Sequence, residues 1–160
     1  MQKEFYKTYP VFITHESHNK HIYSFTTDSD IVYTVVFTRA NYLFKEECTA
    51  CHEVHEISFV PNGDKSRFDQ SIRHTIIDLM QIFIDKHECP VLYVCDSLDL
   101  RAECRSRLFK KWFETSRLNS GFKYDFKNLV FDDFSMKVEI ISRESDQNFN
   151  DYFQELEVFG

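Results

Sequence analysis

The sequence contains no run of about 18 consecutive apolar residues, the length at which a transmembrane helix is expected. Residues 1–10 mix Lys3, Glu4 and Lys7 with aromatic residues and contain no apolar core of the kind that a signal peptide has. These two absences argue against insertion into a membrane and against secretion. They predict a cytoplasmic protein with no membrane partner.

Positive charge is also scarce. The chain has 19 Lys and Arg residues against 26 Asp and Glu residues, so its formal net charge is -7 at pH 7. An acidic protein of this kind is a poor nonspecific binder of nucleic acid or of anionic lipid, although a local basic patch could override the overall charge. We therefore expect no general affinity for nucleic acid.

The number of cysteines is odd. There are five, at positions 48, 51, 89, 95 and 104. An odd number without a secretory signal fits reduced thiols in a reducing compartment better than a framework of disulfides. This agrees with the expected cytoplasmic location.

The chain also lacks internal repeats, low-complexity segments and linkers. Its 160 residues are one domain's worth of chain, and 42% of them are hydrophobic, including 17 Phe and 8 Tyr. We expect residues 1–160 to form a single folded domain.

The strongest local pattern lies in residues 90–114. Five apolar residues, Val91 to Cys95, stand between a proline and an aspartate, which is typical of a strand covered on both faces. Asp96 and Ser97 can then cap a basic amphipathic helix. This unit predicts a strand followed directly by a helix.

Further strands and helices follow from the spacing of apolar residues. Residues 22–27 and 31–37 are rich in β-formers around a polar turn, and a third strand ends near Val60, before Pro61. A helix is predicted from Ser66 or Asp69 to about Asp85, because apolar residues recur there at helical spacing. Strands at 124–131 and 136–141 predict a second hairpin, before a closing helix.

This order predicts an α+β fold, with a mostly antiparallel mixed sheet flanked by helices. The helix between the strand near Val60 and the strand at Val91 is long enough to return the chain, so these two strands are expected to be parallel.

The same order resembles the GNAT acyltransferase superfamily over residues 22–141, with residues 145–160 as an additional C-terminal helix. Residues 56–61, Glu-Ile-Ser-Phe-Val-Pro, resemble that superfamily's fourth strand, and residues 99–113 resemble one of its later helices. The chain also resembles an uncharacterised family of small bacterial proteins that share a Cys-Asp-Ser motif after a strand and an Arg-Leu-Phe-x-x-Trp-Phe motif. That second resemblance implies no known activity.

The GNAT resemblance implies an acyl-CoA site, and this chain departs from it in two places. GNAT enzymes hold the CoA pyrophosphate on a glycine-rich loop, whereas residues 62–69 contain one glycine, Gly63; Lys65 and Arg67 could partly compensate. Many GNAT enzymes also carry a tyrosine that protonates the leaving thiolate, and Phe109 stands at that place. If acetyl-CoA binds, we expect it at Gly63, Lys65 and Arg67. A pantetheine arm would also need the strands near Val60 and Val91 to splay apart, which the sequence does not decide.

A short cysteine and histidine cluster lies before the third strand. Cys48, Cys51 and His52 match the pattern for c-type haem attachment, and with His55 they could hold zinc. The alternative, which we favour, is a loop and strand start whose Cys and His side chains bind no metal. His15, His18 and His21 stand three apart, but their polar neighbours indicate a loop.

Basic residues gather on the predicted helix after residue 97. They include Arg107, Lys110, Lys111 and Arg117, which could bind an acidic surface of a protein partner. The alternative is a solvated face on which acidic neighbours pair with these residues. The aromatic stripe of the closing helix could likewise form a contact surface or a homodimer, or it could pack on the protein's own core.

These observations favour a macromolecular binding or regulatory module, with a protein partner, no cofactor and no standard acyl-CoA chemistry. The alternative is a divergent acyl-CoA-dependent N-acyltransferase that uses acetyl-CoA. No residue is identified as catalytic.

Overall fold

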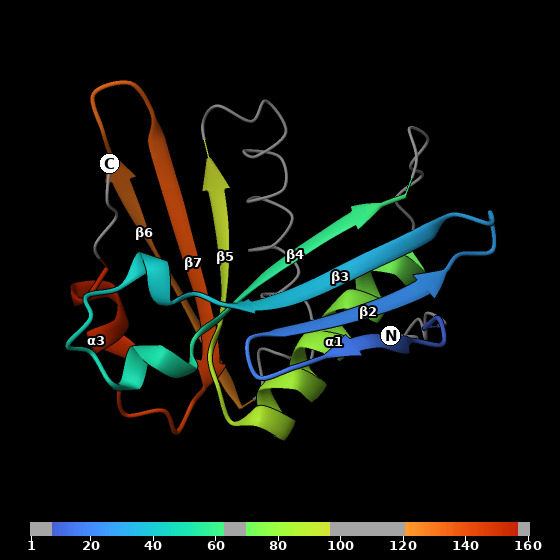
Figure 1. Cartoon of the computed structure of the whole chain (residues 1–160), viewed down its shortest axis with the longest axis horizontal. Helices are drawn as coiled ribbons and strands as arrows, with labels where there is room; N and C mark the ends of the chain where they lie inside the picture. The colour runs from blue at the N-terminus through green and yellow to red at the C-terminus, as the bar shows by residue number, and fades with distance from the viewer. Residues whose placement is uncertain (1–7, 63–69, 97–120, 157–160) are drawn as a thin grey trace, which may run out of the picture.

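A computed structural model describes residues 8–62, 70–96 and 121–156 of this chain. Its strands form a seven-stranded sheet in the order β1-β2-β3-β4-β5-β7-β6, with helices packed on it (Figure 1). Every neighbouring pair is antiparallel except β4 and β5, which are parallel. The α+β fold and the single parallel crossover predicted from the sequence are confirmed.

The first half of the sheet is an antiparallel meander. Its strands are β1 (Phe12–Glu16), β2 (Lys20–Thr26), β3 (Val32–Arg39) and β4 (His55–Pro61). In the β2–β3 turn, Asp30 has a φ of 61°, a conformation that aspartate tolerates better than most residues. The Thr27 hydroxyl accepts hydrogen bonds from the Ser29 and Ile31 amides there. The predicted hairpin is therefore correct.

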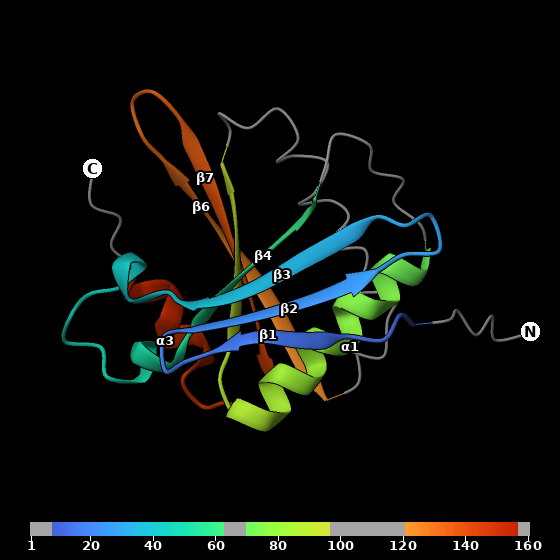
Figure 2. The same cartoon turned by 45° about the vertical axis from the view of Figure 1, so that its right-hand side comes forward.

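Helix α1 (Gln70–His87) returns the chain from β4 to β5 (Val91–Asp96). Its buried side chains include Ile72, Ile76, Met80 and Phe83, which are among the apolar residues that predicted the helix. Phe83 stacks on Phe37 of β3 with ring centroids 4.0 Å apart. Figures 1 and 2 show α1 lying along one face of β1–β4.

The second half of the sheet is the predicted hairpin, β6 (Phe122–Val130) and β7 (Ser135–Arg143). Helix α3 (Phe149–Gln154) and the 3-10 helices η1 (Asn41–Leu43) and η2 (Ala50–Glu53) pack beside it. They enclose a second core cluster with Leu92, Val138 and Ile140. The described closing helix is shorter than the predicted 145–160, and its Phe149 and Tyr152 are buried in this core rather than on a contact surface.

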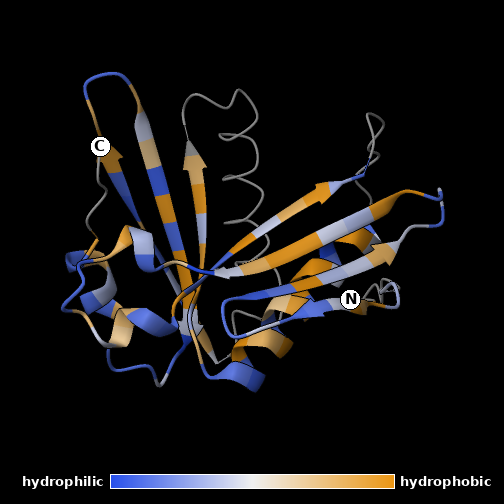
Figure 3. Ribbon diagram, viewed as in Figure 1, coloured by the Kyte–Doolittle hydropathy of each residue, from blue (hydrophilic) through white to orange (hydrophobic). Residues whose placement is uncertain are grey.

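Hydrophobic residues concentrate in the strands and hydrophilic residues in the connecting turns, as Figure 3 shows. Among the described residues, no helix combines the length and the apolar character that crossing a bilayer requires. The predicted basic helix after residue 97 lies outside the described residues.

Candidate functional site

The parallel strands β4 and β5 separate soon after they meet. They share two register pairs, His55 with Val91 and Glu56 with Leu92, although β4 continues to Pro61 and β5 to Asp96. Figure 1 shows the two strands diverging beyond this point. The sequence does not predict this splay. A pantetheine site of the kind implied by the GNAT resemblance requires it.

The alternation of strand hydrogen bonds fixes which peptide groups point between β4 and β5. The His55 amide donates to the Pro90 carbonyl at 3.0 Å, so position 90 of β5 faces β4. The unbroken register of β5 with β7 then places positions 92, 94 and 96 on the same side. The N–H and C=O of Val94 therefore point toward β4, past the last register pair.

An acidic residue stands at the point of separation. The Tyr42 hydroxyl donates to Oε2 of Glu56 at 2.5 Å, and Glu56 belongs to the last register pair of β4. Burial raises the pKa of the Glu56 carboxyl, and the bond from Tyr42 only partly offsets this. Burial and the same bond raise the pKa of Tyr42. The pair therefore places a carboxyl group that ionises less readily than usual near the start of the splay.

A second carboxylate, Glu139 of β7, is fully buried. The Tyr124 hydroxyl donates a short hydrogen bond to its Oε1, the Cys95 thiol lies 3.6 Å from Oε2, and the Lys137 ammonium lies 3.9 Å from Oε1. Burial and the bond to Glu139 raise the pKa of Tyr124. Cys95 is a buried core residue, as expected of a small apolar side chain.

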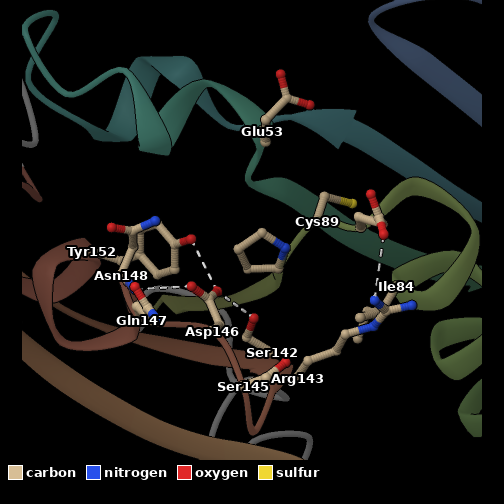
Figure 4. A pocket seen from close by; sticks show the side chains of 12 residues that line it. Glu53, Ile84, Cys89, Ser142, Arg143, Ser145, Asp146, Gln147, Asn148 and Tyr152 are labelled. Atoms are coloured by element: carbon tan, nitrogen blue, oxygen red, sulfur yellow. Dashed lines mark hydrogen bonds and ion pairs between the residues drawn. The ribbon is translucent and has the colours of Figure 1, made fainter.

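A pocket of about 380 Å³ lies near the start of β5, between α1 and the segment after β7. Its central carboxylate, Asp146, accepts hydrogen bonds from Ser142 Oγ at 2.5 Å, Tyr152 OH at 3.0 Å and the Asn148 amide at 2.9 Å (Figure 4). These bonds occupy the carboxylate within the fold. Arg143, on the rim, pairs with Asp85 of α1 at 3.1 Å. The pocket is therefore built from groups that already bind one another.

The cysteines in the predicted metal cluster are oxidised. Cys48 and Cys51 form a disulfide, so the expectation that all five thiols are reduced is wrong for this pair, and the pair supplies no free thiolates for zinc. The short Cys-x-x-Cys spacing brings the sulfurs together in the turn before η2, where both residues contact the second core cluster.

The two histidines of that cluster point away from it. His55 directs its Nδ1 to the Glu53 carbonyl at 2.8 Å, and its ring lies against Phe83 of α1. His52 Nε2 lies 3.4 Å from the Glu46 carbonyl oxygen. The structure therefore does not bring Cys48, Cys51, His52 and His55 together as four ligands.

Other predicted site residues lie outside the described residues. They are Gly63, Lys65 and Arg67 for CoA, and Arg107, Lys110, Lys111 and Arg117 for a partner; all seven remain predictions. No sequence pattern predicts a role for Glu56, Tyr42 or Glu139. Glu139 lies between Val138 and Ile140 on a predicted strand, so its side chain is expected on the opposite face of that strand. The alternation alone does not show whether this opposite face is also buried.

Comparison with known proteins places the chain in a family. Residues 68–158 match a family of unknown function (DUF6169). No curated protein matches the sequence. One similar solved structure is described as "a putative phosphinothricin N-acetyltransferase"; it is 11% identical, with a TM-score of 0.47, over 81% of this chain and 72% of that one. Because the family match spans more than half of the sequence, this chain belongs to the family of unknown function DUF6169.

Proposed function

We propose that this protein is a binding module that accepts an extended segment of a protein partner between β4 and β5. The observation that carries the proposal is the separation of the two strands after two register pairs. Beyond the last register pair the peptide groups of Val94 still face β4, and an extended chain added as a further strand can pair with groups of this kind. A peptide supplies the alternating N–H and C=O groups that such a position needs.

The composition of the chain supports binding over acyl-CoA chemistry. The loop after β4 contains one glycine, Gly63, where a pyrophosphate loop needs several for close approach. Phe109, at the place of the expected proton donor, cannot protonate a thiolate. Neither deficiency affects the binding of a peptide.

The direct test uses peptides selected from a random-sequence display library on the purified protein, with a proline variant as the probe. Val94→Pro removes an N–H that points toward β4 and not toward the β7 ladder, so the fold should tolerate it. We expect this variant to weaken the selected peptide at least tenfold. Val130→Pro is the matched control.

The control makes the same substitution at an edge of the sheet. The Phe131 amide donates to Phe134, so alternation along β6 points the Val130 N–H away from β7. Val130→Pro should bind the peptide as the wild type does. Equal binding by Val94→Pro and wild type would refute the proposal. If Val94→Pro does not fold, the hydrogen-exchange rate of the Val94 amide decides instead, since a bound peptide must slow it.

The basic residues after position 97 bear on which peptide segments the protein would bind. We propose that Arg107, Lys110, Lys111 and Arg117 favour partner segments with acidic residues on either side of the bound stretch. Reversing Lys110 and Lys111 to glutamate should weaken acidic peptides more at low salt than at high salt. A loss that does not depend on salt, or no loss, would remove these basic residues from the binding surface.

The second candidate is a divergent acyl-CoA-dependent N-acyltransferase. The observation that favours it is the same splay, combined with the Glu56–Tyr42 pair where the strands part. In this reading Lys65 and Arg67 would hold the CoA phosphates and Glu56 would accept a proton from the substrate amine. An Arg67→Glu variant that binds CoA as tightly as wild type would count against this role of Arg67.

A further inference from the structure

Two histidines and a glutamate meet at the end of helix α1. Glu16 is the last residue of β1, His21 lies opposite it on β2, and His87 is the last residue of α1. Each offers one ligand atom, and the three atoms lie within 4.8 Å of one another. The hairpin register places Glu16 beside His21, and the end of α1 brings in His87 from 66 positions further along the chain.

Two imidazole nitrogens at this place, one from each histidine, have no hydrogen-bond partner among the described residues. They are Nδ1 of His21, a residue that is 6% exposed, and the buried Nε2 of His87. Oε1 of Glu16 lies 3.6 Å from His21 Nδ1, which is beyond hydrogen-bond distance. Buried polar atoms of this kind normally have a partner.

We infer that Glu16, His21 and His87 form a binding site for a divalent transition-metal ion of the zinc type. Ligands at 2.0–2.2 Å from a tetrahedral ion lie about 3.4 Å apart, which is close to the separation of His21 Nδ1 and Glu16 Oε1. His87 is half-buried and Glu16 is partly exposed, so both side chains can rotate to close the site. Two imidazoles and one carboxylate select zinc over magnesium or calcium, which prefer oxygen ligands.

The surrounding groups fit a cation site. Lys86 is the competing cation, with its Nζ 3.8 Å from Oε1 of Glu16, but its side chain is 55% exposed and can turn to solvent. Phe83 packs against both histidine rings. The bound ion would tie the edge strand β1 to the end of α1.

This site does not depend on the proposed peptide binding. It uses none of the residues of the β4–β5 splay, and a bound ion would act on the edge strand β1, whereas the splay lies in the middle of the sheet. An experiment that refutes one of the two proposals therefore leaves the other unaffected.

The test is a titration of chelator-treated full-length protein with zinc chloride, read by calorimetry and by elemental analysis. We expect one zinc ion per chain, a rise in the melting temperature with zinc, and no rise with magnesium chloride. His87→Gln and Glu16→Gln should each weaken zinc binding roughly tenfold or more. The matched control is His18→Gln, which changes an exposed histidine in the turn of the same hairpin.

Cobalt provides the second readout. Co²⁺ bound in place of zinc should show the visible bands of nitrogen and oxygen ligands without a thiolate charge-transfer band, which excludes the cysteines as ligands. Circular dichroism of each variant confirms that loss of binding is not loss of fold. Zinc binding that is unchanged in both His87→Gln and Glu16→Gln, or no saturable binding below about 100 μM, would overturn the inference.

Discussion

Glu139 shows how single residues hold this sheet together. Its carboxylate is fully buried, and its described partners come from three strands: Tyr124 of β6, Cys95 of β5 and Lys137 of β7. A buried carboxylate is tolerated only when charged or hydrogen-bonding groups compensate for the water it has lost. Glu139 therefore ties the hairpin β6–β7 to the centre of the sheet.

Replacing Glu139 should destabilise the protein. Glu139→Leu leaves the Tyr124 hydroxyl and the Lys137 ammonium without this partner, and we expect the free energy of unfolding in urea to fall by about 1–3 kcal/mol. Glu144→Leu, at an exposed position just after the same strand, should change it by no more than about 0.5 kcal/mol. Equal effects of the two substitutions would show that the Glu139 contacts contribute nothing.

Tyr152 predicts how stability depends on alkaline pH. It is 3% exposed, and burial, followed by the Asp146 carboxylate, raises the pKa of its hydroxyl above the ordinary value of 10.0. Above pH 10 the unfolded chain therefore loses this proton while the folded protein keeps it. The stabilising effect of the neutral hydroxyl is complete below pH 10 and is lost as the pH rises further.

The free energy of unfolding of the wild type should accordingly fall more steeply above pH 10 than that of Tyr152→Phe, by about 1.4 kcal/mol per pH unit. Urea unfolding at pH 9 and pH 11 measures the difference. Parallel pH profiles for wild type and variant would mean that Tyr152 loses its proton as readily in the folded protein as in the unfolded chain.

At the scale of the elements, a disulfide fastens the connection between β3 and β4. The chain leaves β3 through η1 and η2, and the Cys48–Cys51 disulfide links the turn before η2 to η2 itself. The same segment contributes Leu43, Phe44 and Val54 to the second core cluster, against α3. The disulfide thus restrains a connection that covers one face of the sheet.

Removing the disulfide should cost stability without unfolding the protein. The double variant Cys48→Ser, Cys51→Ser loses the restraint on a short loop, for which chain-entropy arguments predict a loss of about 2 kcal/mol in the free energy of unfolding. Dithiothreitol should lower the stability of the wild type by a similar amount and leave the variant unchanged. A wild type that is insensitive to reduction would contradict the stabilising role of the bond.

The elements also show what a sequence can and cannot predict. The helix before β5, both hairpins and the parallel crossover were predictable, because apolar spacing and turn residues such as Asp30 and Pro61 act locally. The splay of β4 and β5 depends on how two distant strands pack, and no local pattern encodes it. The approach of His87 to Glu16 likewise follows from the length and direction of α1, which a spacing rule among His15, His18 and His21 cannot detect.

At the scale of the whole molecule, the two core clusters meet at β5. Val91 and Tyr93 of β5 belong to the cluster that contains the buried residues of α1, whereas Leu92 belongs to the cluster of α3, η1 and η2. The strands β4 and β5 part in this central region of the sheet, and the peptide groups of Val94 point into that junction. A ligand bound there would contact both strands, so its binding should stabilise the whole fold.

The measurement that tests the central claim most directly is thermal unfolding of the purified protein with acetyl-CoA and with CoA at millimolar concentration. A ligand that binds only the folded state at a hundredfold excess over its Kd adds about 2.7 kcal/mol of stability, which is readily detected. A module for protein segments without acyl-CoA chemistry predicts an unchanged melting temperature with both ligands. A clear upward shift with either ligand would contradict the account and favour the acyltransferase.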